Sequence, residues 1–114
     1  MTEQACYVLT ALVEGPSHGY GIVGEVATLS EGRVKLRVGT LYGVLDRLVA
    51  EGQVEPDRDE VFQGRLRRYY RLTGSGRQAL ADEVRRQNAN AQVAGQRLAR
   101  YPAIRPAADA GGGL

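Results

Sequence analysis

The chain has 114 residues, enough for one compact domain and one additional element. Hydrophobic residues make up 43% and charged residues 25%, which indicates a globular protein. The sequence has no apolar run near the ~20 residues that span a bilayer, and its start lacks the features of a secretory signal, so we expect a cytoplasmic protein with no membrane partner.

Three helices are expected in the first half of the chain. Apolar residues at helical spacing predict the first over residues 3–13, with Thr2 as its N-cap. Ser17 is a candidate N-cap for the second, and the third is predicted over residues 38–51. The residues expected to face inward from the second helix are Ile22, Val23, Val26 and Leu29.

Two short segments flank the third helix. Residues 33–36 alternate charged and apolar side chains, which predicts an extended segment before it. Gly52 comes directly after the helix, at a position that favours left-handed backbone.

The period of the apolar pattern then changes from 3.6 to 2, which predicts a β-hairpin. A short strand begins at Val54, residues 57–64 form a polar turn region, and a second strand follows. Leu66, Tyr70 and Leu72 alternate with polar residues, so we expect them on a half-buried face.

A long helix is predicted next, with Thr73 as its cap and its end near Arg100. The fold class is therefore mainly α with a small β-hairpin (α+β), arranged as a winged helix-turn-helix with a long C-terminal dimerisation helix. We expect three parts: a winged helix-turn-helix domain over residues 1–73, a dimerisation helix over 74–101 and a disordered tail over 102–114.

The outer face of the third helix suits the major groove of DNA. Small residues allow close approach of the helix backbone, and basic and hydroxyl side chains can contact phosphates or base edges. The candidate contacts are Lys35, Arg37, Gly39, Thr40, Tyr42, Gly43 and Arg47. The alternative is a surface helix that tolerates small residues.

Four arginines lie between residues 65 and 71. Guanidinium groups on a hairpin can neutralise the phosphate backbone or enter a minor groove, so Arg65, Arg67 and Arg68 are candidate DNA contacts; Arg71 shares a face with Arg65 and Arg67. The alternative is a charged edge strand that prevents aggregation.

The long helix carries a heptad seam, which predicts a homodimer. Steps of four and three residues join Leu80, Val84, Gln87, Ala91, Ala94, Leu98 and Tyr101. Packing against the first helix of the same chain is the alternative, and one helix can use two faces.

The sequence gives little support to an enzyme, a metal site or a cofactor. His18 is the single histidine and Cys6 the single cysteine, so we expect neither a metal centre nor a catalytic triad. We expect His18 to pack or to hydrogen-bond at a helix start.

Several motifs together resemble the PadR family of transcription regulators, in its short class. They are Gly15-Pro16-Ser17-His18-Gly19-Tyr20, the run from Val38 to Leu48, Glu51-Gly52, and the run from Gly64 to Thr73 with Gly76. The resemblance implies a dimeric repressor whose third helix recognises DNA and whose hairpin is the wing. It points to Lys35, Thr40, Tyr42 and the wing arginines as DNA contacts.

We therefore expect a transcriptional repressor that binds a near-palindromic operator in double-stranded DNA. The alternative is a protein-interaction module whose basic hairpin meets an acidic partner. A separate hypothesis is that a small hydrophobic or aromatic effector binds between the first and last helices, near Tyr7.

Overall fold

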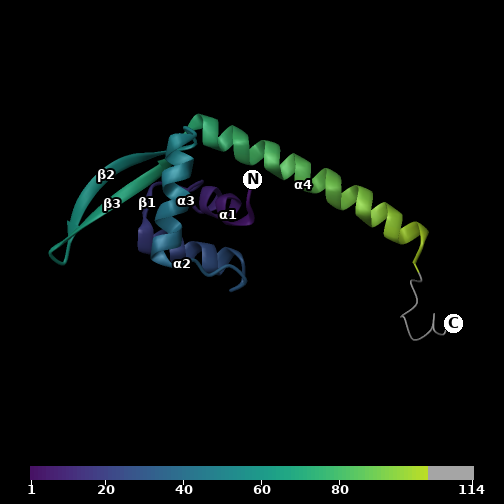
Figure 1. Ribbon diagram of the computed structural model, residues 1–114, viewed down its shortest axis with the longest axis horizontal. Coiled ribbons are helices and arrows are strands. Elements are labelled where there is room, and N and C mark those ends of the chain that lie inside the picture. Colours follow the sequence, from purple (N-terminus) through teal and green to yellow (C-terminus); the bar gives the residue numbers. More distant parts are fainter. Residues whose placement is uncertain (103–114) are drawn as a thin grey trace. The chain divides into compact units, whose positions relative to one another are not determined.

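The computed structural model describes residues 1–102, which form four helices and three strands (Figure 1). In chain order these are α1 (Glu3–Ala11), β1 (Ser17–His18), α2 (Gly19–Leu29), α3 (Val38–Ala50), β2 (Val54–Phe62), β3 (Arg65–Leu72) and α4 (Gly74–Arg100). Residues 1–83 form one compact unit and residues from 84 onward a second. Apart from Pro102, the predicted tail lies outside the described residues.

The starts of α1 and α2 show which side chains cap them. Thr2 accepts a hydrogen bond from the backbone N–H of Ala5 at 3.0 Å, which confirms the expected cap of α1. The prediction for Ser17 is wrong, because Ser17 pairs with Tyr70 in the sheet. The cap of α2 is His18, whose Nδ1 accepts from the backbone N–H of Gly21 at 3.3 Å.

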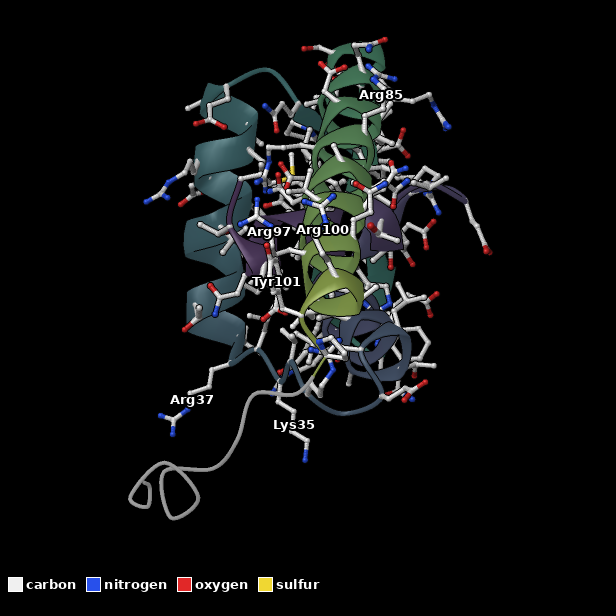
Figure 2. The ribbon with its side chains drawn as sticks, turned by 90° about the vertical axis from the view of Figure 1, so that its right-hand side faces the viewer. Lys35, Arg37, Arg85, Arg97, Arg100 and Tyr101 are labelled. Carbon is white, nitrogen blue, oxygen red and sulfur yellow. The ribbon has the colours of Figure 1, made fainter. Side chains whose placement is uncertain are left out.

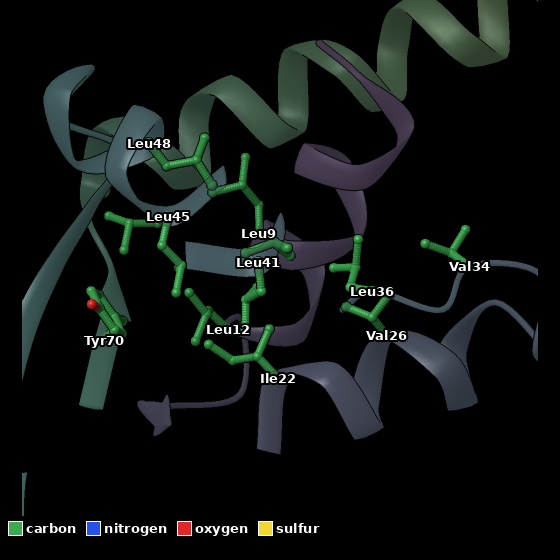
Figure 3. Close-up of a cluster of buried hydrophobic side chains, with 12 residues drawn as sticks. Leu9, Leu12, Ile22, Val26, Val34, Leu36, Leu41, Leu45, Leu48 and Tyr70 are labelled. Atoms are coloured by element: carbon green, nitrogen blue, oxygen red, sulfur yellow. The ribbon is translucent and has the colours of Figure 1, made fainter. Parts of the chain in front are cut away.

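The core lies where α1, α2 and α3 converge (Figure 3). Leu9, Ile22 and Leu41 are fully buried there. Val34 and Leu36 also enter the core, as the predicted alternation of residues 33–36 indicates, and residues 34–37 pair with no strand of the sheet.

Two side chains at helix ends depart from the predicted inward stripes. Leu29, expected to face inward, is 41% exposed at the end of α2. Val13, the last residue of the helix predicted over 3–13, lies beyond the end of α1 at Ala11 and is also exposed. A helix end has fewer neighbours to cover it, which periodicity alone does not register.

The three strands form an antiparallel sheet in the order β1-β3-β2. The predicted polar turn over residues 57–64 is wrong, because β2 continues to Phe62 and the loop consists of Gln63 and Gly64 alone. Their φ values of 50° and 77° fit a type I′ hairpin turn. Residues 58–62 of the predicted turn region instead pair with β3.

The hairpin extends beyond the three helices (Figure 1). This explains why Leu66, predicted to be half-buried, is 67% exposed near the tip, whereas Tyr70, nearer the base, is 7% exposed. The period-2 pattern predicted the strand correctly but not the length over which the core covers it.

The first turns of α4 belong to the first unit. Thr73 caps the helix as predicted, accepting from the backbone N–H of Gly76 at 2.9 Å. Gly76 is buried, and a Cβ there would overlap the backbone oxygen of Gln53. Leu80 packs against the core one turn later. Within residues 1–102, no helix is long and apolar enough to cross a membrane.

Candidate nucleic-acid interface

The outer face of α3 is open and lined by small and polar residues. Leu41, Leu45 and Leu48 are buried, which leaves the opposite side of the helix in solvent. The predicted contact residues on this side are all exposed or partly exposed: Gly39, Thr40, Tyr42, Gly43 and Arg47.

Neither glycine of this face is required by its own surroundings. A Cβ at Gly39 or Gly43 would meet nothing within 4 Å among the described residues. Glycine in a helix interior is less favourable than alanine by about 1 kcal/mol. Gly43, in the interior of α3, therefore reduces helix stability without relieving any contact inside the described part of the chain.

Two basic side chains precede α3. Lys35 and Arg37 are exposed and extend away from the ribbon just before the helix begins (Figure 2). Among residues 1–102, neither they nor Arg47 forms an ion pair with an acidic side chain. The positive charge around α3 is thus available to an external anion.

The arginines of the hairpin fall into two groups, and those in the first are paired with acids of β2. Arg71 contacts Glu55 through Nε at 2.8 Å and Asp57 through Nη1 at 3.0 Å. Arg68 contacts Asp59 through Nε at 3.3 Å. Cross-strand pairing therefore offsets much of the charge of these two arginines.

Two acids of β2, Asp57 and Glu60, are held in their ionised form by arginine side chains. Hydrogen bonds from Arg58 and Arg71 lower the pKa of the Asp57 carboxyl, and a hydrogen bond from Arg58 lowers the pKa of Glu60. Both carboxylates are accordingly negative at neutral pH. The base of the hairpin is a mixed-charge surface rather than a basic one.

The second group lies nearer the tip. Within the described residues, Arg65 and Arg67 have no carboxylate within ion-pair distance. The Arg67 guanidinium lies over the ring of Phe62, 3.8 Å from its centroid, and its Nη1 is 3.5 Å from Nε2 of His18. Within the described residues, the hairpin arginines that form no ion pair therefore lie in its outer part, where Glu60 is the cross-strand neighbour of Arg67.

A groove of about 230 Å³ lies between this outer part, the start of α2 and α3. Its lining includes predicted contacts (Tyr42, Arg65, Arg67, Arg68) and residues that sequence reasoning did not assign to DNA: His18, Gly19, Tyr20, Phe62, Gln63 and Leu66. A Cβ at Gly19 would lie 2.8 Å from the Tyr42 hydroxyl, so this glycine lets α3 rest its tyrosine on α2. In the sequence, the Ser17-His18-Gly19-Tyr20 run is the feature that could have indicated the groove residues contributed by the start of α2.

The remaining predicted sites lie elsewhere. Tyr7 on α1 is partly buried against the core, and its hydroxyl accepts from Arg33 Nη2 at 2.9 Å. On α4, Leu80 is half-buried. The predicted seam residues that follow it are exposed in the single chain: Val84, Gln87, Ala91, Ala94 and Leu98 on the helix, and Tyr101 directly after its end. Across residues 1–102, no three His, Cys, Asp or Glu side chains are grouped so as to hold a metal ion.

Comparisons with known proteins agree on one family. Residues 8–82 match the model of the transcriptional regulator PadR-like family. The chain is 35% identical over 79 residues to the transcriptional regulator Rv3488 of Mycobacterium tuberculosis, covering 69% of this chain and 70% of that protein.

Solved structures of the same family share the fold. A PadR family regulator from Eggerthella lenta is 26% identical, with a TM-score of 0.69 over 82% of this chain and 80% of that one. Bacillus subtilis PadR, solved in complex with operator DNA, is 25% identical, with a TM-score of 0.62 over 70% of this chain and 45% of that one.

Proposed function

Because the chain belongs to the PadR-like family of transcriptional regulators, we propose that it binds duplex DNA sequence-specifically, with α3 as recognition helix and the β2–β3 hairpin as wing. Members of this family are transcriptional regulators and not enzymes. The operator complex of Bacillus subtilis PadR supports carrying a DNA-binding role over to this chain.

The outer face of α3 is the observation that carries the proposal. Gly39 and Gly43 leave the helix backbone bare, and Lys35, Arg37 and Arg47 surround it with positive charge that forms no ion pair within residues 1–102. A bare helix face allows close approach to base edges in a major groove, while the cations contact the phosphates on either side. Two wing arginines that form no ion pair in the described part of the chain, Arg65 and Arg67, extend the same basic surface.

The dimer is part of the proposal. Residues 84–100 of α4 expose Val84 and Leu98 at positions of the predicted heptad seam. Such a seam is stabilised when a second copy covers it. A twofold-symmetric dimer presents two recognition helices to half-sites about 34 Å apart, so the operator is expected to be near-palindromic.

The proposed function has three further parts. The protein represses transcription, a small aromatic effector that binds near Tyr7 releases it from DNA, and it is located in the cytoplasm. A dimer that occupies an operator blocks transcription when that operator overlaps a promoter. An effector that favours a different arrangement of the dimer would lower DNA affinity by its differential binding to the two states.

The decisive experiment is selection of a binding site from random duplexes, followed by affinity measurements across a salt series. We expect a selected duplex with two related half-sites, and binding that weakens steeply with salt. Arg65→Gln should weaken binding to all duplexes and reduce the slope of log K against log salt by about 1.

Arg33→Gln is the matched control, because Arg33 is an exposed arginine that contacts Glu3 and Tyr7 and not the groove. It should leave both the affinity and the salt slope unchanged. Absence of duplex binding at low salt, together with binding of an acidic protein partner, would contradict the proposal and favour the protein-interaction alternative.

A further inference from the structure

The hydrogen bonds of His18 specify which of its ring nitrogens carries the proton. Nδ1 accepts from the backbone N–H of Gly21 at the start of α2. A neutral imidazole has one N–H and one acceptor nitrogen, so an accepting Nδ1 leaves the proton on Nε2. The Nε2–H is thus a donor that the cap does not use.

This donor faces a second donor. Nη1 of Arg67 lies 3.5 Å from His18 Nε2, and an N–H of arginine cannot bond to a nitrogen that itself carries hydrogen. Two donors side by side are complementary to one acceptor placed between them. Both border the groove between the wing and α2.

Aromatic neighbours hold both side chains in position. Phe62 lies under the Arg67 guanidinium at 3.8 Å, and Tyr69 packs edge-on against the His18 ring with centroids 5.2 Å apart. Gly21 also contributes, since a Cβ there would lie 2.5 Å from Ser17 Oγ and 3.5 Å from His18 Nε2. The donor pair is therefore preorganised before any ligand arrives.

The surrounding charges favour an anionic acceptor. Burial, and then the Arg67 charge, lower the pKa of His18, so the ring is neutral at pH 7 as the cap requires. Glu60 is the acid whose charge opposes this shift, and its carboxylate is held by Arg58 Nε at 2.6 Å. Arg65, which forms no ion pair with any described residue, also lines the groove, as do the tyrosines Tyr20 and Tyr42.

We propose that His18 Nε2–H and the Arg67 guanidinium together hold one phosphodiester of the DNA backbone at the groove between the start of α2 and the wing. This inference rests on the proposed function and specifies one contact within it. An open groove beside the bare face of α3 favours a backbone phosphate over a free phosphate ion, because the backbone runs alongside any helix lying in the major groove.

The first test is the tautomer. Long-range ¹H–¹⁵N spectra of the free protein at pH 7.5 should show His18 with its proton on Nε2, and the same nitrogen should shift on addition of the selected duplex. A proton on Nδ1, with Nε2 accepting from Arg67, would overturn the proposal.

The second test combines two variants with duplexes in which single phosphates are replaced by neutral methylphosphonates. His18→Asn retains a capping oxygen for Gly21 but removes the Nε2–H donor. It should weaken binding about 3- to 10-fold without changing the salt slope, because the lost donor is neutral. Arg67→Gln should weaken binding more and reduce the slope by about 1.

The methylphosphonate scan identifies the contact. At one phosphate per half-site, methylphosphonate replacement should weaken DNA binding by the wild-type protein and by the Arg33→Gln control. The same replacement should have little further effect on binding by the double variant that carries His18→Asn and Arg67→Gln. Thermal unfolding of each variant checks that the fold is retained.

Three outcomes separate the two proposals. If the wild-type protein binds no duplex, the proposed function fails. If the wild-type protein binds, but methylphosphonate replacement at every position lowers the DNA affinity of the double variant as much as that of the wild type, only the inference fails. If inorganic phosphate shifts the His18 resonance at micromolar concentration while no duplex does, the site serves a free anion and the inference is again overturned.

Discussion

Replacement of Gly43 by alanine should have opposite effects on stability and on DNA binding. Gly43 lies six residues into α3, and a Cβ there would meet nothing within 4 Å in the described part of the chain. Alanine is favoured over glycine in a helix interior by about 1 kcal/mol. The free energy of unfolding should therefore increase by about 1 kcal/mol, which raises Tm by roughly 4–8 °C for a unit of this size.

The same methyl group should reduce DNA affinity. If the bare face of α3 lies against base edges, the added carbon must be accommodated in a packed interface, at a cost of about 1–3 kcal/mol. That free energy corresponds to a loss of about 5- to 150-fold in affinity. Fluorescence anisotropy with the selected duplex measures the loss, and urea unfolding at one protein concentration measures the gain in stability.

Gly24→Ala is the matched control. Gly24 lies inside α2, its Cβ would also meet nothing within 4 Å among residues 1–102, and it is not part of the groove lining. This variant should gain similar stability and bind DNA like the wild type. If Gly43→Ala gains stability yet binds the duplex with unchanged affinity, α3 does not enter the groove and the reasoning is refuted.

Three further predictions concern stability, pH and assembly. Gly76→Ala should lower the free energy of unfolding by several kcal/mol, since its Cβ would overlap the backbone oxygen of Gln53. If the variant unfolds in urea at a midpoint near that of the wild type, the close contact is not present. Folding lowers the pKa of His18 below its ordinary 6.5, so the unfolded chain binds the proton more readily and the free energy of unfolding should fall as pH drops through about 6.5. His18→Asn should abolish that component in urea unfolding measured from pH 5.5 to 8, and an unchanged profile would count against it. Leu98→Arg should shift the protein towards monomer in sedimentation equilibrium, and a dimer of wild-type strength would exclude this part of the seam.

The hairpin shows where sequence reasoning succeeds and where it fails. Alternation predicted the strand over residues 65–72 because the side-chain period depends on local backbone geometry. The polar residues 57–62 have the composition of a turn, but they belong to β2, and the side chains that pair with them lie on the opposite strand. Charged residues suit a strand when cross-strand pairing satisfies them, as Arg71 does for Asp57.

His18 shows the same limit at the candidate site. The sequence predicted that it would pack or bond at a helix start, and it caps α2. Its second nitrogen is placed beside Arg67, 49 residues later, by the pairing of His18 with Tyr69 in the sheet. Local sequence contains no sign of that neighbour.

The sequence by itself determined the order of the four helices and of the two hairpin strands, the buried leucines of α3, and the small residues opposite them, because each depends on periodicities of a few residues. It did not indicate β1, whose two residues pair with a strand about fifty residues later. The tertiary structure decided which arginines are neutralised by acidic side chains and how far the hairpin extends from the core. It also decided that α2, α3 and the wing line one groove. These depend on charges and packing between residues distant along the chain, and such contacts exist only once the strands have paired and the helices have packed.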